Sequence, residues 1–266
     1  MTILIFRIPL PLQKENEVND LLMKRFDIEN YIAQLSMDCV IFGYEQKTLK
    51  VLISKFKFGK ESWVLPGGYI RKTESINGAA TRVLKERTGL ENIYLEQFRV
   101  FGDDHRIVGH PFNAVMMDEL PKFDAERFDP EVTAWMTGRF VCIGFYALVD
   151  IQKVSPKNGE FDERLEWRSI DDIPTMVYDH NEILRYGLES LRQNLDEKLI
   201  GFNLLPETFT MKEVQELYEA VYAKAFTASN FQKKILDLDV LERLEKKFTG
   251  AQNKAPYLYR FKNNAV

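Results

Sequence analysis

Residues 67–90 read GGYIRKTESINGAATRVLKERTGL, and this stretch decides how the rest of the chain is interpreted. Ser75 to Thr88 has the apolar spacing of an amphipathic helix, and Gly89 is the residue type that commonly follows a helix. Residues three or four apart share one face of a helix, so Arg82, Val83, Glu86 and Arg87 lie together. The stretch therefore predicts a loop, a helix and a second loop.

The spacing resembles the Nudix box, the signature of a family of metal-dependent pyrophosphatases. The box reads Gly, five residues, Glu, seven residues, Arg-Glu, an aliphatic residue, any residue, Glu-Glu, any residue, Gly and an aliphatic residue. The positions that match are Gly68, Glu74, Arg82, Leu84, Glu86, Gly89 and Leu90. Val83 and Arg87 stand where the family has glutamates.

These two differences remove most of the metal site that the resemblance implies. Magnesium prefers an octahedral shell of carboxylate, water and phosphate oxygens. Glu86 is the one carboxylate left at the three helical positions and the only metal ligand we expect if a metal is bound. Arg87 would repel a divalent cation and could neutralise a bound phosphate instead. We therefore expect binding without cleavage, with no catalytic residues and no required cofactor.

The alternative is a Nudix pyrophosphatase that acts on ADP-ribose or a similar nucleoside diphosphate derivative. It would use Glu74 and Glu86 with Mg²⁺ or Mn²⁺. A carboxylate from a later loop, Glu160 or Asp162, would then replace a missing ligand.

Composition indicates a soluble protein of two domains, because 266 residues with 45% hydrophobic and 29% charged residues are ordinary for a globular chain of this size. The apolar run at residues 1–12 is short and is broken by Arg7, Pro9 and Pro11, so we expect no signal peptide and no membrane partner. Cys39 and Cys142 lie in apolar runs and outside any metal-binding motif. Buried free thiols in a reducing cytoplasm are expected.

Charge is distributed unevenly along the chain. From Asn230 onward there are eight Lys or Arg and four Asp or Glu, a net charge of +4. The whole chain has a net charge of −4, so residues 1–229 carry −8. This asymmetry is compatible with a small nucleic-acid-binding domain on a larger acidic body. Ordinary surface variation is the other explanation, since the excess is modest.

Five segments before residue 170 have the composition of strands, and a helix follows them. The strands are expected at 37–44, 49–56, 93–101, 140–149 and 166–169, and the helix at 180–194. The resemblance implies a Nudix α/β/α sandwich over residues 31–197, preceded by an N-terminal arm at 1–30. Residues 109–138 are expected to form an irregular insertion that packs on the core, on a partner subunit or over the pocket.

The C-terminal part, residues 198–266, has the order of a winged helix-turn-helix. Thr210 and Glu213 form a capping box that opens a helix at 211–222. Thr227 is expected to be the N-cap of a second helix at 228–238. Strands at 241–248 and 257–261 would then form the wing.

A winged helix predicts which side chains meet DNA. The second helix would enter the major groove with its N-terminal polar residues, where Asn and Gln contact adenine, while lysines meet phosphates. The DNA-binding residues we expect are Ser229, Asn230, Gln232, Lys233, Lys234, Lys246, Lys247 and Lys254. The alternative is a protein-interaction module, a helical bundle whose polar face is merely solvated. A long polar loop that carries lysines favours DNA.

The two halves together resemble the Nudix-related transcriptional regulators. The resemblance rests on the box and on residues 167, 179–183, 209–222, 230–234 and 258–261. It implies a homodimer, a palindromic operator in double-stranded DNA and an effector that is a pentose sugar or an ADP-ribose-type nucleotide. We expect a metabolite-responsive repressor, and the residues do not select the effector.

The effector is expected in a cleft bounded by the box and by one later arginine. The ligand-binding residues we expect are Gly67, Gly68, Arg71, Arg82, Arg87 and Arg106. His180, near the start of a helix, is expected to be a capping or packing residue.

Overall fold

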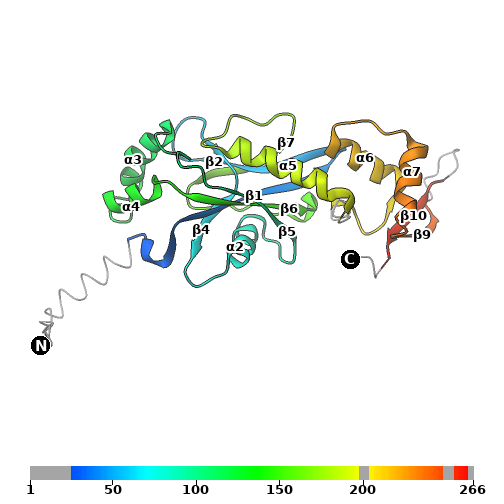
Figure 1. Ribbon diagram of the computed structural model, residues 1–266, viewed down its shortest axis with the longest axis horizontal. Coiled ribbons are helices and arrows are strands. Elements are labelled where there is room, and N and C mark those ends of the chain that lie inside the picture. Colours follow the sequence, from blue (N-terminus) through cyan, green and yellow to red (C-terminus); the bar gives the residue numbers. More distant parts are fainter. Residues whose placement is uncertain (1–24, 198–203, 248–254, 263–266) are drawn as a thin grey trace, which may run out of the picture.

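A seven-stranded mixed sheet forms the centre of the N-terminal domain (Figure 1). The computed structural model describes residues 25–197, 204–247 and 255–262. Strands follow the order β3-β2-β1-β6-β5, with β4 added to β1 and β7 added to β2. The β1–β6 pair is parallel, and the other pairs are antiparallel. The strands are β1 (Tyr31–Glu45), β2 (Thr48–Phe56), β3 (Trp63–Val64), β4 (Gly67–Arg71), β5 (Tyr94–Phe101), β6 (Val141–Val149) and β7 (Asp162–Ser169).

The β1–β2 hairpin turns on two residues, Gln46 and Lys47, whose φ angles of 50° and 63° match the turn that suits the twist of paired strands. Strand β1 begins at Tyr31, six residues before the predicted start. Gln34 interrupts it with a φ of 55°, and the pairing with β4 shifts register there. This irregular segment has no alternating pattern that would identify it as a strand.

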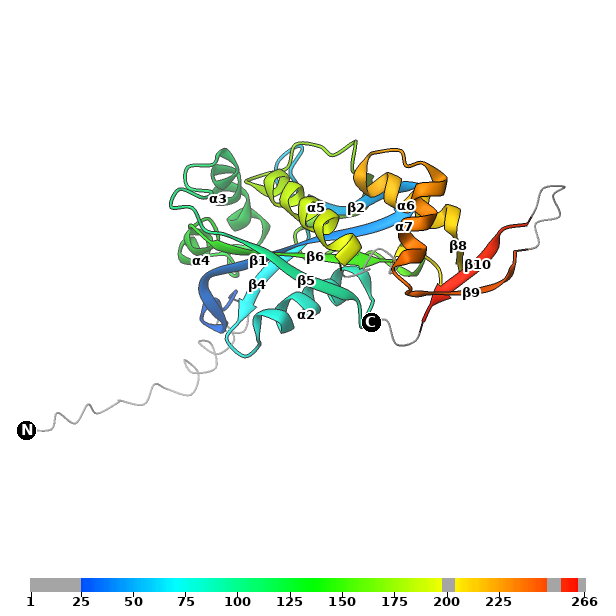
Figure 2. The same cartoon turned by 45° about the vertical axis from the view of Figure 1, so that its right-hand side comes forward.

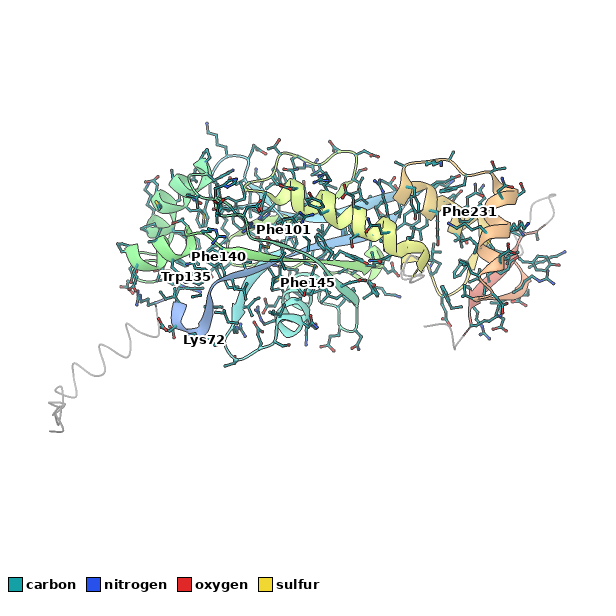
Figure 3. The ribbon with its side chains drawn as sticks, viewed as in Figure 1. Lys72, Phe101, Trp135, Phe140, Phe145 and Phe231 are labelled. Atoms are coloured by element: carbon teal, nitrogen blue, oxygen red, sulfur yellow. The ribbon has the colours of Figure 1, made fainter. Side chains whose placement is uncertain are left out.

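Two helices cover opposite faces of the sheet, because alternate side chains of each strand point to opposite sides. Helix α2 (Ile76–Thr88) packs Ala79, Ala80, Val83 and Leu84 against Met37, Cys39, Ile41 and Phe145. Helix α5 (His180–Glu197) packs Ile183, Leu184 and Leu191 over Val40, Phe42 and Tyr146. Figure 3 shows Phe145 on the α2 side and Phe101 near α5. The predicted α/β/α sandwich is confirmed.

Residues 109–138 form two helices, α3 (Pro111–Phe123) and α4 (Pro130–Met136), where an irregular segment was expected. Pro111 and Pro130 occupy the first turns, where a missing N–H costs nothing. Phe112, Met116, Leu120, Phe128 and Val132 pack together with Phe58 and Val64. The segment therefore packs on the core, one of the three placements considered. Its prolines mark helix starts as well as breaks.

The C-terminal domain has the expected winged-helix order (Figure 1). Its elements are β8 (Phe209–Thr210), α6 (Met211–Tyr222), α7 (Ala228–Asp237), β9 (Leu241–Lys246) and β10 (Tyr257–Phe261). The three strands pair in the order β8-β10-β9. Thr210 and Glu213 form the predicted capping box. Thr227 occupies the predicted N-cap position of α7, although its side chain makes no cap hydrogen bond.

Both domains contribute to one continuous hydrophobic cluster, in which Leu191 and Leu195 of α5 pack with Leu217 and Val221 of α6. Arg192 Nε donates to the Val221 carbonyl at 2.7 Å, and Tyr222 Oη donates to the Arg192 carbonyl at 2.8 Å. Figure 2 shows α6 near the end of α5. The winged helix is thus fastened to the helix that spans the sheet.

Short elements complete the described chain. The 3₁₀ helices η1 (Ile28–Asn30) and η2 (Ile151–Lys153) precede β1 and follow β6. Of the helices in the described ranges, none is long and apolar enough to cross a bilayer. The N-terminal arm proposed for residues 1–30 lies outside the described residues up to position 24.

We predict that Thr210→Ala lowers the free energy of unfolding by about 1 kcal/mol, because the hydroxyl caps the Glu213 N–H of α6 at 3.2 Å. Thr227→Ala is the matched control and should change stability by a few tenths of a kcal/mol, since its hydroxyl makes no cap bond. Urea denaturation followed by circular dichroism measures both. Equal losses in the two variants would contradict the assignment.

Candidate functional site

The carboxylates of the box are held by one arginine. Arg82 donates to both carboxylate oxygens of Glu74, from Nε at 2.9 Å and from Nη2 at 2.7 Å. Its Nη1 lies 3.3 Å from Glu86 Oε2, and Nη2 also donates to the Tyr69 carbonyl at 3.0 Å. The bonds from Arg82 hold the pKa of Glu74 below its ordinary value. Both Nudix-box glutamates therefore act as partners of Arg82 in this structure.

Val83 points into the core on the α2 side of the sheet and is 2% exposed. A Cβ atom on Gly68 would lie 3.1 Å from its Cγ2 atom, so the helix and β4 approach closely there. A glutamate at position 83 of this packing would enter an apolar environment, where an unpaired carboxylate is costly.

Arg87 forms an ion pair with Asp162, whose side chain is 1% exposed. Asp162 also accepts a bond from Ser54 Oγ at 2.5 Å and one from the Gly159 N–H at 2.5 Å. Arg87 was expected to contact a ligand, and in the structure its guanidinium is the cation that the buried Asp162 carboxylate requires. Gly159 permits the approach, since a Cβ atom there would overlap the Arg87 guanidinium.

The same contacts remove the replacement metal ligands considered from the sequence. Asp162 is paired with Arg87, and Glu160 is paired with Arg127 at 2.9 Å. Among residues 25–197, 204–247 and 255–262, no group of three His, Cys, Asp or Glu side chains is placed to hold a metal ion. With an apolar Val83 and a cationic Arg87 at the helix, the residues present do not fit the divalent cation that the family implies.

The residues expected to bound one cleft lie on opposite sides of the sheet. Arg82 lies with α2, whereas Arg106 lies on the α5 side, where it bonds Asp179 at 2.6 and 2.9 Å and the Phe140 carbonyl at 3.1 Å. Gly67 adjoins Asp38, and Asp38 lies 3.9 Å from Arg106. Arg71 is exposed at the end of β4. Gly67 and Arg106 thus both lie beside Asp38, whereas Arg82 bonds the Tyr69 carbonyl of β4 from the other side of the sheet.

A buried polar cluster lies between Arg106 and the sheet. Cys142 Sγ lies 3.0 Å from Asp38 Oδ2, and burial raises the pKa of this thiol well above its ordinary value. His180 Nδ1 accepts from the Leu65 N–H at 2.9 Å, so the ring proton of neutral His180 is on Nε2, 3.7 Å from Asp38. His180 is buried and acts in packing, as expected, and Cys39 and Cys142 are buried free thiols.

A cavity of about 230 Å³ opens beside the N-terminal end of α5. Sequence reasoning identified one of its lining residues, Arg106, and missed the rest. The other residues that line it include Arg99, His105, Tyr178, Asp179 and Glu182. Residues 178–182 lie far from the box in sequence, and only the fold places them beside the loop after β5.

The exposed face of α7 carries the polar residues expected to meet DNA. Phe231 and Ile235 are buried, whereas Ser229, Asn230, Gln232, Lys233 and Lys234 are exposed. Figure 3 shows Phe231 inside the C-terminal domain. The helix therefore presents one polar face to solvent, as the prediction requires.

The wing lysines differ from one another. Lys246 is exposed, with Nζ 5.3 Å from the Tyr257 ring centroid, whereas Lys247 Nζ forms an ion pair with Glu213 at 3.1 Å. Lys247, directly after β9, thus ties the wing to the first turn of α6, a role the sequence did not suggest. Lys254 lies outside the described residues. Arg243, exposed on β9 beside Tyr257, is a further surface cation that sequence reasoning missed.

We predict that Arg87→Met lowers the free energy of unfolding by about 3–5 kcal/mol, because it leaves the Asp162 carboxylate buried without its cation. Adding Asp162→Asn should recover much of the loss, since a neutral amide keeps partners for Ser54 and Gly159. Lys85→Met, on the solvent side of the same helix, is the control and should change stability little. Urea denaturation measures all four proteins, and equal losses for Arg87→Met and Lys85→Met would refute the role of the pair.

Comparison with known proteins places both halves. A Nudix domain model matches residues 33–187, and a model described as the NrtR DNA-binding winged helix domain matches residues 201–261. The chain is 24% identical over 233 residues to the ADPR responsive transcriptional repressor NtrR of Acinetobacter baylyi, covering 85% of this chain and 81% of that protein. It is 23% identical over 166 residues to an ADP-ribose pyrophosphatase of Methanocaldococcus jannaschii, covering 62% of this chain and 80% of that one.

The solved structures agree in fold over both domains. Shewanella oneidensis NrtR complexed with a 27mer DNA is 25% identical, with a TM-score of 0.64, covering 86% of this chain and 94% of that one. A MutT/nudix family protein from Enterococcus faecalis is 18% identical, with a TM-score of 0.60, covering 96% and 100%. The chain belongs to the Nudix family, within the branch of regulators that carries a C-terminal winged helix domain of the NrtR type.

Proposed function

We propose that the chain is a DNA-binding transcriptional repressor whose Nudix domain binds a small effector and does not cleave it. The observation that carries the proposal is the exposed polar face of α7, formed by Ser229, Asn230, Gln232 and Lys233 over the buried Phe231. In a winged helix this face enters the major groove. The Shewanella relative, of the same two-domain fold, was solved with DNA.

A palindromic operator and a homodimer are part of the same proposal. Regulators of this architecture bind as homodimers whose two recognition helices meet matching half-sites of a palindrome. We assign this chain the same arrangement, acting in the cytoplasm. The wing supplies Lys246 and Arg243 at the surface for phosphate contacts.

The effector belongs to the Nudix domain. The Acinetobacter relative is named for its response to ADP-ribose, which makes ADP-ribose or a pentose sugar the class of effector to test. Binding to the state that does not fit DNA would release the operator.

We do not assign hydrolysis to this chain, because the carboxylates of the box are held in ion pairs within the protein. Glu74 and Glu86 are paired with Arg82, and Asp162 is paired with Arg87. Among the described residues, no group of three His, Cys, Asp or Glu side chains is placed to form an oxygen shell for magnesium. The pyrophosphatase activity named for the Methanocaldococcus relative is therefore not assigned to this chain.

We predict that Asn230→Ala weakens binding to the DNA upstream of its own gene by about tenfold or more, because it removes a base contact worth about 1–3 kcal/mol. Lys233→Ala should lower the slope of log affinity against log salt by about one unit. Fluorescence anisotropy at several salt concentrations measures both.

Lys122→Ala is the control for these variants, since Lys122 is an exposed lysine of α3 at the opposite end of the molecule (Figure 1). It should leave both affinity and salt slope unchanged. Failure of the wild-type chain to bind any upstream fragment at low salt would refute the assignment to DNA.

We predict that ADP-ribose incubated with the protein and Mg²⁺ or Mn²⁺ yields no AMP above the rate of the metal alone, because the box does not hold the metal. Chromatography of the nucleotides measures this. Formation of AMP that disappears in Glu86→Gln would overturn the non-catalytic assignment and support the pyrophosphatase.

A further inference from the structure

The cavity beside the N-terminal end of α5 is separate from the box and has a defined chemical character. Its volume of about 230 Å³ is below the roughly 300–1,000 Å³ typical of sites for drug-sized ligands. It therefore suits a small ring better than a whole dinucleotide-sized molecule.

The charges that line the cavity nearly balance. Arg99 and Arg106 provide two guanidiniums, and Asp103, Asp179 and Glu182 provide three carboxylates. A diphosphate would meet more anions than cations in this space, which opposes its binding there. A polyol suits the mixture, because each hydroxyl group can both donate to a carboxylate and accept from a guanidinium.

The guanidiniums are held in place by other contacts. Arg106 is fixed by its paired bonds to Asp179 and its bond to the Phe140 carbonyl. Arg99 stacks on Tyr186 of α5, with its guanidinium carbon 3.8 Å from the ring centroid. Side chains held in this way lose little conformational entropy when a ligand binds.

Glu182 is a carboxylate of the lining whose oxygens have capacity left for a ligand. It lies 3.9 Å from Arg185 Nη2, beyond hydrogen-bond distance, while Arg185 Nη1 donates to Glu189 at 2.7 Å. Its side chain is 54% exposed. Both oxygens of Asp179, by contrast, already accept from Arg106.

Helix α5 connects this cavity to the DNA-binding domain. Glu182 lies in its first turn, whereas Arg192 near its other end bonds the Val221 carbonyl of α6. The 18 residues of α5 span about 27 Å at 1.5 Å per residue. A ligand that shifts the first turn would therefore move a helix that is fastened to the winged helix.

We infer that this cavity is the effector site and that it takes a ribose-like polyol ring, held by Glu182 with Arg99 and Arg106. The inference rests on the proposed repressor function and names where its effector binds. The ring could come from a free pentose or from the terminal ribose of ADP-ribose, whose diphosphate would then lie outside the cavity.

Isothermal titration calorimetry on the full chain tests the site with D-ribose, L-arabinose, D-xylose, ADP-ribose and ADP. We expect a pentose or ADP-ribose to bind, and ADP, which lacks the terminal ring, to bind far more weakly. Glu182→Gln should weaken the ligand about tenfold or more, because it removes a charged acceptor. Glu189→Gln, two turns further along α5, is the matched control and should bind as the wild type does.

Binding by free pentoses identifies a sugar as the source, and binding by ADP-ribose alone identifies the nucleotide. The site is overturned if none of these ligands binds, if Glu182→Gln binds as tightly as Glu189→Gln, or if ADP binds as tightly as ADP-ribose. Thermal unfolding of each unliganded variant shows that the fold is kept. Binding to DNA is measured separately by anisotropy. A chain that does not bind DNA would refute the repressor function, whereas the calorimetry tests ligand binding in the cavity independently.

Discussion

The buried ion pair between Arg87 and Asp162 determines what the box helix of this chain does. Asp162 begins β7, Ser54 lies on β2 and Arg87 lies on α2, so the carboxylate joins three elements at one point. Neither charge can lose its partner without leaving the other uncompensated. Arg82 holds Glu74 and Glu86 in the same way. The helix face that binds a metal in the pyrophosphatases is therefore occupied by ion pairs within this chain.

With Glu74, Glu86 and Arg87 of the box engaged in ion pairs, the effector site that we propose lies on the opposite face of the sheet. Helix α5 covers that face, borders the cavity at one end and contacts α6 at the other. The β1–β2 hairpin supports the same junction through the ion pair of Lys47 with Glu216 at 2.8 Å. The winged helix thus contacts two elements of the Nudix domain, and these contacts are the route by which we propose that the effector acts on it.

The sequence predicted the fold well where periodic patterns are regular. The box helix, α6 and the central strands follow from apolar spacing, caps and a seven-position motif. It failed at α3 and α4, whose prolines occupy first turns, and at β8, which is two residues long. The site was harder to predict than the fold. A motif gives the spacing of residues along one helix, but it does not show which distant residues will contact them after folding. No residue near Arg87 in the sequence indicates that its partner is Asp162. Arg106 likewise pairs with Asp179, which lies 73 residues further along the chain.

We propose that ion pairs within the chain, and no divalent metal, hold the box. A titration of the full chain with Mn²⁺, followed by electron paramagnetic resonance of the free ion, tests it most directly. The signal should rise as it does in buffer, with no stoichiometric binding. One tightly bound Mn²⁺ per chain, released by Glu86→Gln, would contradict it.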